Sequence, residues 1–235
     1  MKKLAIIAAL VLTGTAQAAE LFDNGPVVGP LLRSVLKAPS TTFGFGAQTT
    51  AGNTVADDFT VGGAGWTLSD IDLFAYQTGA GAFSFTDVTW SIVSGDINGG
   101  SVVASGTTAV TDGGLVGYRV TRGGLLDKSR AIYDIKADID DVTLDAGTYW
   151  LTWSLTGSDA FSGPWVPPTQ DARPGNAQQS IAGGPFATLL DAGSGVTSEL
   201  PFVLNGTVSA VPEPATLLSL SAGLALLALR RRRQA

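Results

Sequence analysis

Short runs in which apolar and polar residues alternate occupy most of the chain between residues 55 and 208. A two-residue period buries one face of a β-strand and leaves the other face in water, whereas a helix needs a period of about 3.6. Clusters of Gly, Asp and Asn separate the runs and favour turns. We expect strands at 56–61, 71–76, 88–92, 101–105, 117–121, 131–135, 141–144, 149–155 and 202–208. The pattern predicts an all-β protein, a jelly-roll-like antiparallel β-sandwich.

Some segments depart from simple alternation. The run 71–76 also places Phe74 and Tyr76 on its second side, which gives that strand an aromatic face. Residues 31–37 are a weak helix candidate, and 122–128 fits neither pattern clearly. The segment 161–184 contains four prolines and no alternation, so we predict a long surface loop, with re-entry into the sandwich near 175–180.

The chain has no cysteine and no histidine. It therefore has no Ser-His-Asp or Cys-His catalytic pair, no zinc site built from His or Cys, and no disulfide. A domain without disulfides must be held together by a hydrophobic core.

The charge of the body differs from that of the ends. Residues 19–211 hold 8 basic and 19 acidic residues, so this part carries a net charge of −11, against −6 for the whole chain. An acidic body repels phosphates, and we expect no nucleic-acid partner.

The N-terminus has the three parts of a secretory signal peptide. Lys2 and Lys3 precede an unbroken apolar run at 4–12, and Ala16 and Ala18 are small residues at the usual cleavage positions. Nine apolar residues are too short to span a bilayer. We expect residues 1–18 to be a signal peptide that is removed after Ala18, so that the chain is exported.

The C-terminus resembles a membrane anchor. Residues 215–229 are apolar or small throughout, and Arg230, Arg231, Arg232 and Arg233 follow directly. Clustered arginines beside an apolar helix favour a cytoplasmic end. We expect a short transmembrane helix over 215–229 that holds the exported chain in the inner membrane.

Pro212, Glu213 and Pro214 stand immediately before the apolar run, in a segment that the prolines keep non-helical. A Pro-Glu-Pro motif, a short apolar helix and a terminal arginine cluster together resemble the PEP-CTERM sorting signal of Gram-negative bacteria, here over residues 211–235. The resemblance implies an exosortase-type partner that cleaves near the motif. It also implies that the helix is a transient anchor and that the protein is delivered to the cell surface or an exopolysaccharide matrix.

We expect the β-sandwich ectodomain to occupy residues 19–210. Within it, the segment from Val55 to Gly206 also resembles a recurrent ectodomain of surface-sorted bacterial proteins. Three stretches carry this resemblance: 55–61 with Trp66, 144–151, and 175–180 followed by 200–206. It implies a fold and a surface location, and it implies no activity.

Acidic residues are the only candidate metal ligands in the body. Asp57, Asp58, Asp140 and Asp141 are candidates for a Ca²⁺ site, because calcium takes hard oxygen ligands. EF-hand spacing is absent from the sequence, and aspartates at turns and strand edges explain the same pattern. We otherwise expect no cofactor.

Three functions remain open at this point. A non-enzymatic surface or matrix protein is the first prediction. A carbohydrate-binding module for exopolysaccharide is the alternative, with Trp165 as the candidate contact because it stands among prolines and glycines in the expected loop. An Asp-dependent glycoside hydrolase is the weakest interpretation, because it requires two carboxyls roughly 5–10 Å apart in a cleft. We expect no enzymatic activity.

Overall fold

The computed structural model describes residues 18–209, and nearly all of its regular structure is β-strand. The elements in chain order are β1 (Ala19–Asp23), η1 (Pro30–Leu32), β2 (Arg33–Leu36), β3 (Phe45–Gly46), η2 (Thr49–Ala51), β4 (Thr54–Val61), β5 (Trp66–Thr78), β6 (Phe85–Ser94), β7 (Ser101–Ala109), β8 (Thr111–Thr121), β9 (Ala131–Leu144), β10 (Gly147–Gly157), β11 (Ser162–Val166), β12 (Gln178–Ser180), β13 (Ala187–Thr188) and β14 (Phe202–Val208), where η marks a short 3-10 turn.

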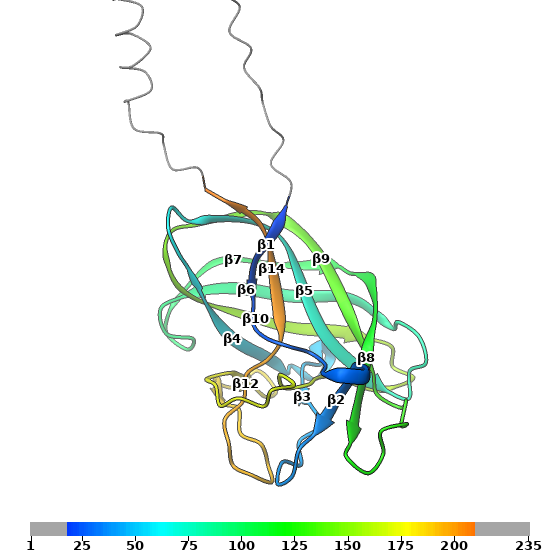
Figure 1. The fold of residues 1–235 in the computed structure, drawn as a ribbon. Coiled ribbons are helices and arrows are strands. Elements are labelled where there is room, and N and C mark those ends of the chain that lie inside the picture. Colours follow the sequence, from blue (N-terminus) through cyan, green and yellow to red (C-terminus); the bar gives the residue numbers. More distant parts are fainter. Residues whose placement is uncertain (1–17, 210–235) are drawn as a thin grey trace, which may run out of the picture.

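The strands form two sheets that face each other (Figure 1). One sheet has the order β1-β14-β5-β9-β8-β2, with β11 added beside β5 and β3 beside β11. The other has the order β13-β12-β4-β10-β6-β7. Strand pairs are antiparallel except β2 and β8, which run parallel. The predicted all-β sandwich is confirmed.

The core lies between the sheets and is built from alternate residues of the long strands. Leu68, Ile71 and Leu73 of β5 face Leu151 and Trp153 of β10, and all five are fully buried. Since each buried residue is followed by one that points the other way, the two-residue period of the sequence is also the period of burial over much of these strands.

The second face of β5 is also covered. Phe74 and Tyr76 pack with Ile132 of β9 in a separate cluster, and the segment before β2 supplies Val27. The predicted aromatic face is therefore real, and it is buried beneath the connections on the outside of the sheet.

Two expected strands at 131–135 and 141–144 are one continuous strand, β9. The acidic residues between them interrupt only the pairing. Leu68 pairs with Val142 and Asp70 with Asp138, so β9 has extra residues opposite Ser69. Such a bulge lets a strand continue through residues that cannot be buried.

The helix expected at 31–37 is wrong. A single 3-10 turn at η1 is followed by β2, which pairs with β8 from Arg33 to Leu36. Pro30 begins the turn, but Leu31 and Leu32 have φ angles of 64° and 53° and so cannot propagate a right-handed helix. Residues 122–128 form turns only.

The long loop expected at 161–184 is also wrong in part, because it contains β11 and β12. In β11, Ser162 pairs with Thr78 and Trp165 with Tyr76, and the register shifts between these pairs. Gly163 and Pro164 occupy that irregularity, where the missing proline donor does not break the ladder. The predicted re-entry near 175–180 is confirmed by β12.

Candidate functional site

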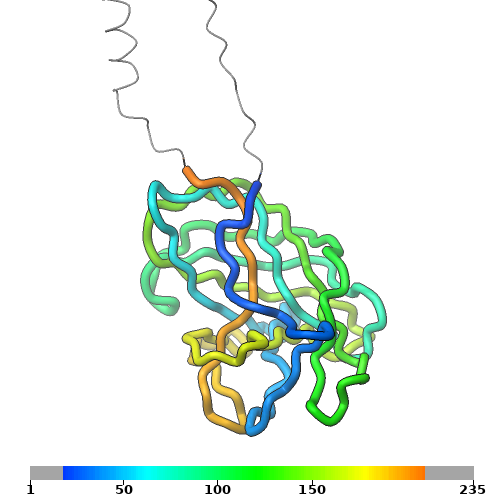
Figure 2. Tube along the Cα trace, in the orientation of Figure 1, coloured from blue at the N-terminus to red at the C-terminus, as the bar shows by residue number. Residues whose placement is uncertain are grey.

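The sorting residues flank the sandwich but lie outside the described residues. This applies to Ala16, to Pro212, Glu213 and Pro214, to the expected helix at 215–229, and to Arg230, Arg231, Arg232 and Arg233. Ala18 is the first described residue and is exposed. Ala19 of β1 pairs with Gly206 of β14, so the first and last strands meet at the same end of the domain (Figures 1 and 2).

Trp165 lies on a strand, although the sequence placed it in a loop. It is half-buried and packs against the cluster that contains Tyr76, Phe43 and Ile132. Its exposed part lines an open groove of about 210 Å³ together with Phe43 and Arg130. Trp165 is therefore both part of the outer core and a surface side chain.

The groove beside Trp165 combines aromatic and cationic groups. The Arg130 guanidinium lies 4.0 Å above the centre of the Phe43 ring, and its Nη1 is 3.0 Å from Asp127 Oδ2. Tyr76 forms the floor and is only 2% exposed; burial raises its pKa to about 12. Aromatic faces beside a guanidinium can stack on a flat ligand and bind its polar groups.

The four calcium candidates do not come together. Asp57 and Asp58 lie on β4 in one sheet, and Asp140 and Asp141 lie on β9 in the other. Asp140 and Asp141 are both exposed at the bulge in β9. Within residues 18–209, no group of three or more acidic side chains is placed to hold a metal ion.

Asp57 has a different partner, Glu199, which the sequence did not indicate. Asp57 is fully buried, and its Oδ2 accepts hydrogen bonds from Leu200 N at 2.7 Å and Asn24 Nδ2 at 2.9 Å. The same Asn24 Nδ2 donates to Glu199 Oε2 at 3.1 Å, so the two carboxyls are neighbours. No local pattern could reveal a pair whose members are separated by most of the chain.

The environment of this pair favours the protonated form of Asp57. Burial of Asp57, assisted by the charge and hydrogen bond of Glu199, raises the pKa of Asp57 to about 8. Arg173 does not neutralise the pair, because its Nη1 binds Asp171 and its Nη2 binds Asn24. A buried pair in contact differs from the separated carboxyls that flank a sugar in a glycosidase cleft.

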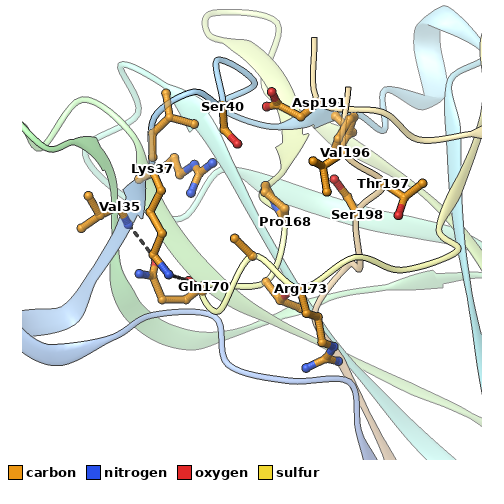
Figure 3. A pocket seen from close by; sticks show the side chains of 15 residues that line it. Val35, Lys37, Ser40, Pro168, Gln170, Arg173, Asp191, Val196, Thr197 and Ser198 are labelled. Carbon is orange, nitrogen blue, oxygen red and sulfur yellow. Dashed lines mark hydrogen bonds between the residues drawn. The ribbon is translucent and has the colours of Figure 1, made fainter. Parts of the chain in front are cut away.

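A small cavity of about 40 Å³, lined by both polar and apolar side chains (Figure 3), lies at the end of the sandwich opposite β1 and the end of β14. Arg119 lines it and donates to Thr42 O, Phe43 O and Ser34 Oγ at 2.8–3.0 Å. Burial lowers the pKa of Arg119 to about 10. The cavity has room for about one water molecule and is too small for a sugar.

Asp191, at the edge of the same cavity, ties two loop segments together. Its carboxylate accepts hydrogen bonds from the backbone N–H groups of Thr41, Thr42, Gly193 and Ser194 at 2.8–3.2 Å. These donors outweigh partial burial and lower the pKa of Asp191 to about 2. The carboxylate therefore organises the loops.

Comparison with protein families adds the part that lies outside the described residues. Residues 210–233 match the PEP-CTERM protein-sorting motif. No curated protein matches the chain. In the described part, 18–209, none of the helical turns is long and apolar enough to cross a membrane.

A β-sandwich followed by a sorting motif defines a class of exported, surface-sorted proteins. This chain carries the PEP-CTERM sorting motif after a β ectodomain. The motif implies processing by an exosortase-type enzyme and sorting to the cell surface.

Proposed function

We propose that this chain is a non-enzymatic surface or extracellular-matrix protein of a Gram-negative bacterium. Residues 1–18 export it, an apolar helix at 215–229 holds it in the inner membrane, and an exosortase-type enzyme cleaves it near Pro212-Glu213-Pro214. The match to the sorting motif carries this proposal, because it begins at residue 210, immediately after the sandwich. The function needs no cofactor.

The arrangement of the sandwich supports a role as a sorted cargo domain. Every strand of both sheets lies between Ala19 and Val208, so cleavage near residue 212 removes none of them. Because β1 and β14 are paired, the export and sorting segments join the domain at one end. The opposite end, with the cavity and its loops, is then the part directed away from the anchor (Figure 2).

The chemistry of the described residues supports a function without catalysis. Asp57 is buried beside the half-buried Glu199, and the two carboxyls accept hydrogen bonds from Asn24 and from backbone groups. Arg119 and Asp191, which are also buried, bind loop backbone. These groups are engaged in holding the fold, which is what a structural or matrix protein requires.

The processing step can be tested with Glu213→Ala in otherwise wild-type cells. We expect the full-length variant to accumulate in the membrane fraction, while mass spectrometry of wild-type surface material lacks every peptide from Ala215 onward. Glu20→Ala is the matched control, because Glu20 is an exposed glutamate that lies outside the sorting motif, and it should be processed normally. Mature surface protein that retains Arg230–Arg233 would contradict the proposal and leave a permanent membrane anchor.

Carbohydrate binding is the second candidate, and the groove beside Trp165 favours it. A sugar ring stacked on the exposed part of Trp165 would lie near Arg130 and Ser162, which line the same groove. The proposed ligand is an exopolysaccharide that carries acidic groups, because Arg130 is cationic.

Glycan binding separates this candidate from a purely structural role. We expect Trp165→Ala to abolish retention on purified exopolysaccharide without unfolding the domain. Trp150→Ala is the control, since Trp150 is also half-buried but lies on β10 of the other sheet. Equal retention of wild type and Trp165→Ala would remove the candidate.

A further inference from the structure

Two turns far apart in the sequence expose four leucines at one corner of the sandwich. Leu31 and Leu32 belong to η1, and Leu125 and Leu126 belong to the turn between β8 and β9; we call them the leucine tip. Leu31 is 83% exposed and Leu126 is 87% exposed. Scattered exposed leucines are ordinary, but a gathered set indicates a contact surface.

The two turns are held together by Arg33. Its Nε donates to Leu125 O at 2.6 Å, and its Nη1 donates to Leu31 O and Leu32 O at 3.1 Å. One guanidinium thus binds the backbone of both turns and keeps the leucines side by side. In Figure 1 this corner lies far from β1 and from the end of β14.

Two of the four leucines of the tip have a strained backbone. Leu31 and Leu32 have φ angles of 64° and 53°, a left-handed conformation that glycine or asparagine adopts with much less strain. Leucines that are neither packed nor conformationally relaxed do not stabilise the fold. Residual strain of this kind is typical of functional sites.

The charge of the corner is opposite to that of the molecule. Residues 30–33 and 122–130 contain four basic residues and one acidic residue, a net charge of +3, whereas the body as a whole carries −11. Arg33 and Lys128 flank the Tyr118 ring, with their charged groups 4.9 and 6.0 Å from its centre. Asp127, the acidic residue, is paired with Arg130. At physiological salt, charges beyond roughly 8 Å are screened, so the local charge decides what docks here.

We propose that the leucine tip docks into the surface of an anionic lipid bilayer. Such a surface offers acidic head groups to Arg33, Arg122 and Lys128 and hydrocarbon to the four leucines. An anionic polysaccharide would meet the basic side chains but leave the leucines in water. A second copy of this chain would bring two tips of net charge +3 together.

The absence of native cysteine allows a direct test on the full chain. Leu126→Cys carries one polarity-sensitive fluorophore, and Ile181→Cys is the matched control, because Ile181 is 66% exposed in the loop between β12 and β13. On mixing with phosphatidylglycerol vesicles, emission from position 126 should shift to shorter wavelength and that from 181 should not. The site-specific signal distinguishes tip insertion from attachment through residues 215–229.

Charge and strain variants complete the experiment. In the labelled Leu126→Cys chain, Arg122→Gln or Lys128→Gln should each raise the lipid concentration that gives half of the maximal fluorescence shift by roughly fivefold. Leu31→Asn should weaken docking by about tenfold or more while leaving the thermal midpoint unchanged or higher, because asparagine relieves the left-handed strain. If Leu31 served only to stabilise the fold, Leu31→Asn would instead lower the thermal midpoint.

Three results would overturn the proposal. One is an equal response to neutral phosphatidylcholine vesicles. Another is a shift that depends on protein concentration without lipid, which would indicate self-association. The third is an unshifted spectrum at position 126 in phosphatidylglycerol.

Discussion

Raising the pH from 5 to 7 should destabilise the ectodomain, and the reason lies in the Asp57–Glu199 pair. In the folded state the pKa of Asp57 is about 8, whereas the ordinary value is 3.8. The folded chain therefore keeps a proton that the unfolded chain releases above pH 4. Stability from this source is complete below the unfolded pKa and is lost as the pH rises toward the folded one.

The magnitude follows from one proton. A difference of one bound proton changes the free energy of unfolding by about 1.4 kcal/mol per pH unit, so about 3 kcal/mol disappears between pH 5 and pH 7. Few other groups interfere, because the chain has no histidine or cysteine to titrate in this range. Asp191, whose pKa is lowered to about 2, contributes stability that is lost only in stronger acid.

Urea unfolding monitored by tryptophan fluorescence at several pH values measures the slope of the free energy of unfolding against pH. Glu199→Gln should make the slope shallower, because the negative charge of Glu199 no longer opposes ionisation of Asp57. Part of the slope should remain, because burial is the main cause of the raised pKa of Asp57. Glu20→Gln is the control, since Glu20 is exposed, and should keep the wild-type slope. Asp57→Asn should lose the slope but also be destabilised at pH 5, because both carboxyl oxygens of Asp57 accept backbone N–H groups and an amide nitrogen cannot.

Two results would refute the reasoning. A wild-type free energy of unfolding that is constant or rises from pH 5 to pH 7 would show that the pair does not hold a proton in the folded state. An unchanged slope in Asp57→Asn would show that the slope comes from other groups.

Three further substitutions test the packing. Trp153→Ala should cost about 3–5 kcal/mol by chemical denaturation, because Trp153 is fully buried between the sheets; a cost below about 1 kcal/mol would contradict its place in the core. Trp165→Ala should cost about 1–2 kcal/mol, since only part of the side chain is buried, and a loss as large as that of Trp153 would show that it is a full core residue. Asp191→Ala should cost at least about 2 kcal/mol and speed proteolysis in the loops at 40–44 and 191–198, because four backbone N–H groups lose their acceptor.

The sequence alone determined the fold class and much of the strand phase. The last strand has the predicted bounds, Phe202–Val208, and the second aromatic face of β5 lies where Phe74 and Tyr76 placed it. These features follow from the alternation of side chains along an extended backbone. That alternation is the same whichever strand pairs with it. The sorting motif is likewise a linear pattern, and the family match confirms it at residues 210–233.

The tertiary structure alone decided which distant residues meet. The acidic run at 138–141 continues a strand because β5 accepts a bulge there, and residues 31–37 form no helix because β8 offers an edge to β2. Asp57 meets Glu199, and Arg33 meets the backbone of Leu125, through the order of the strands in each sheet. The strand order buries the inner faces of both sheets against each other. Because this packing depends on the whole chain, no local pattern of residues predicts the strand order.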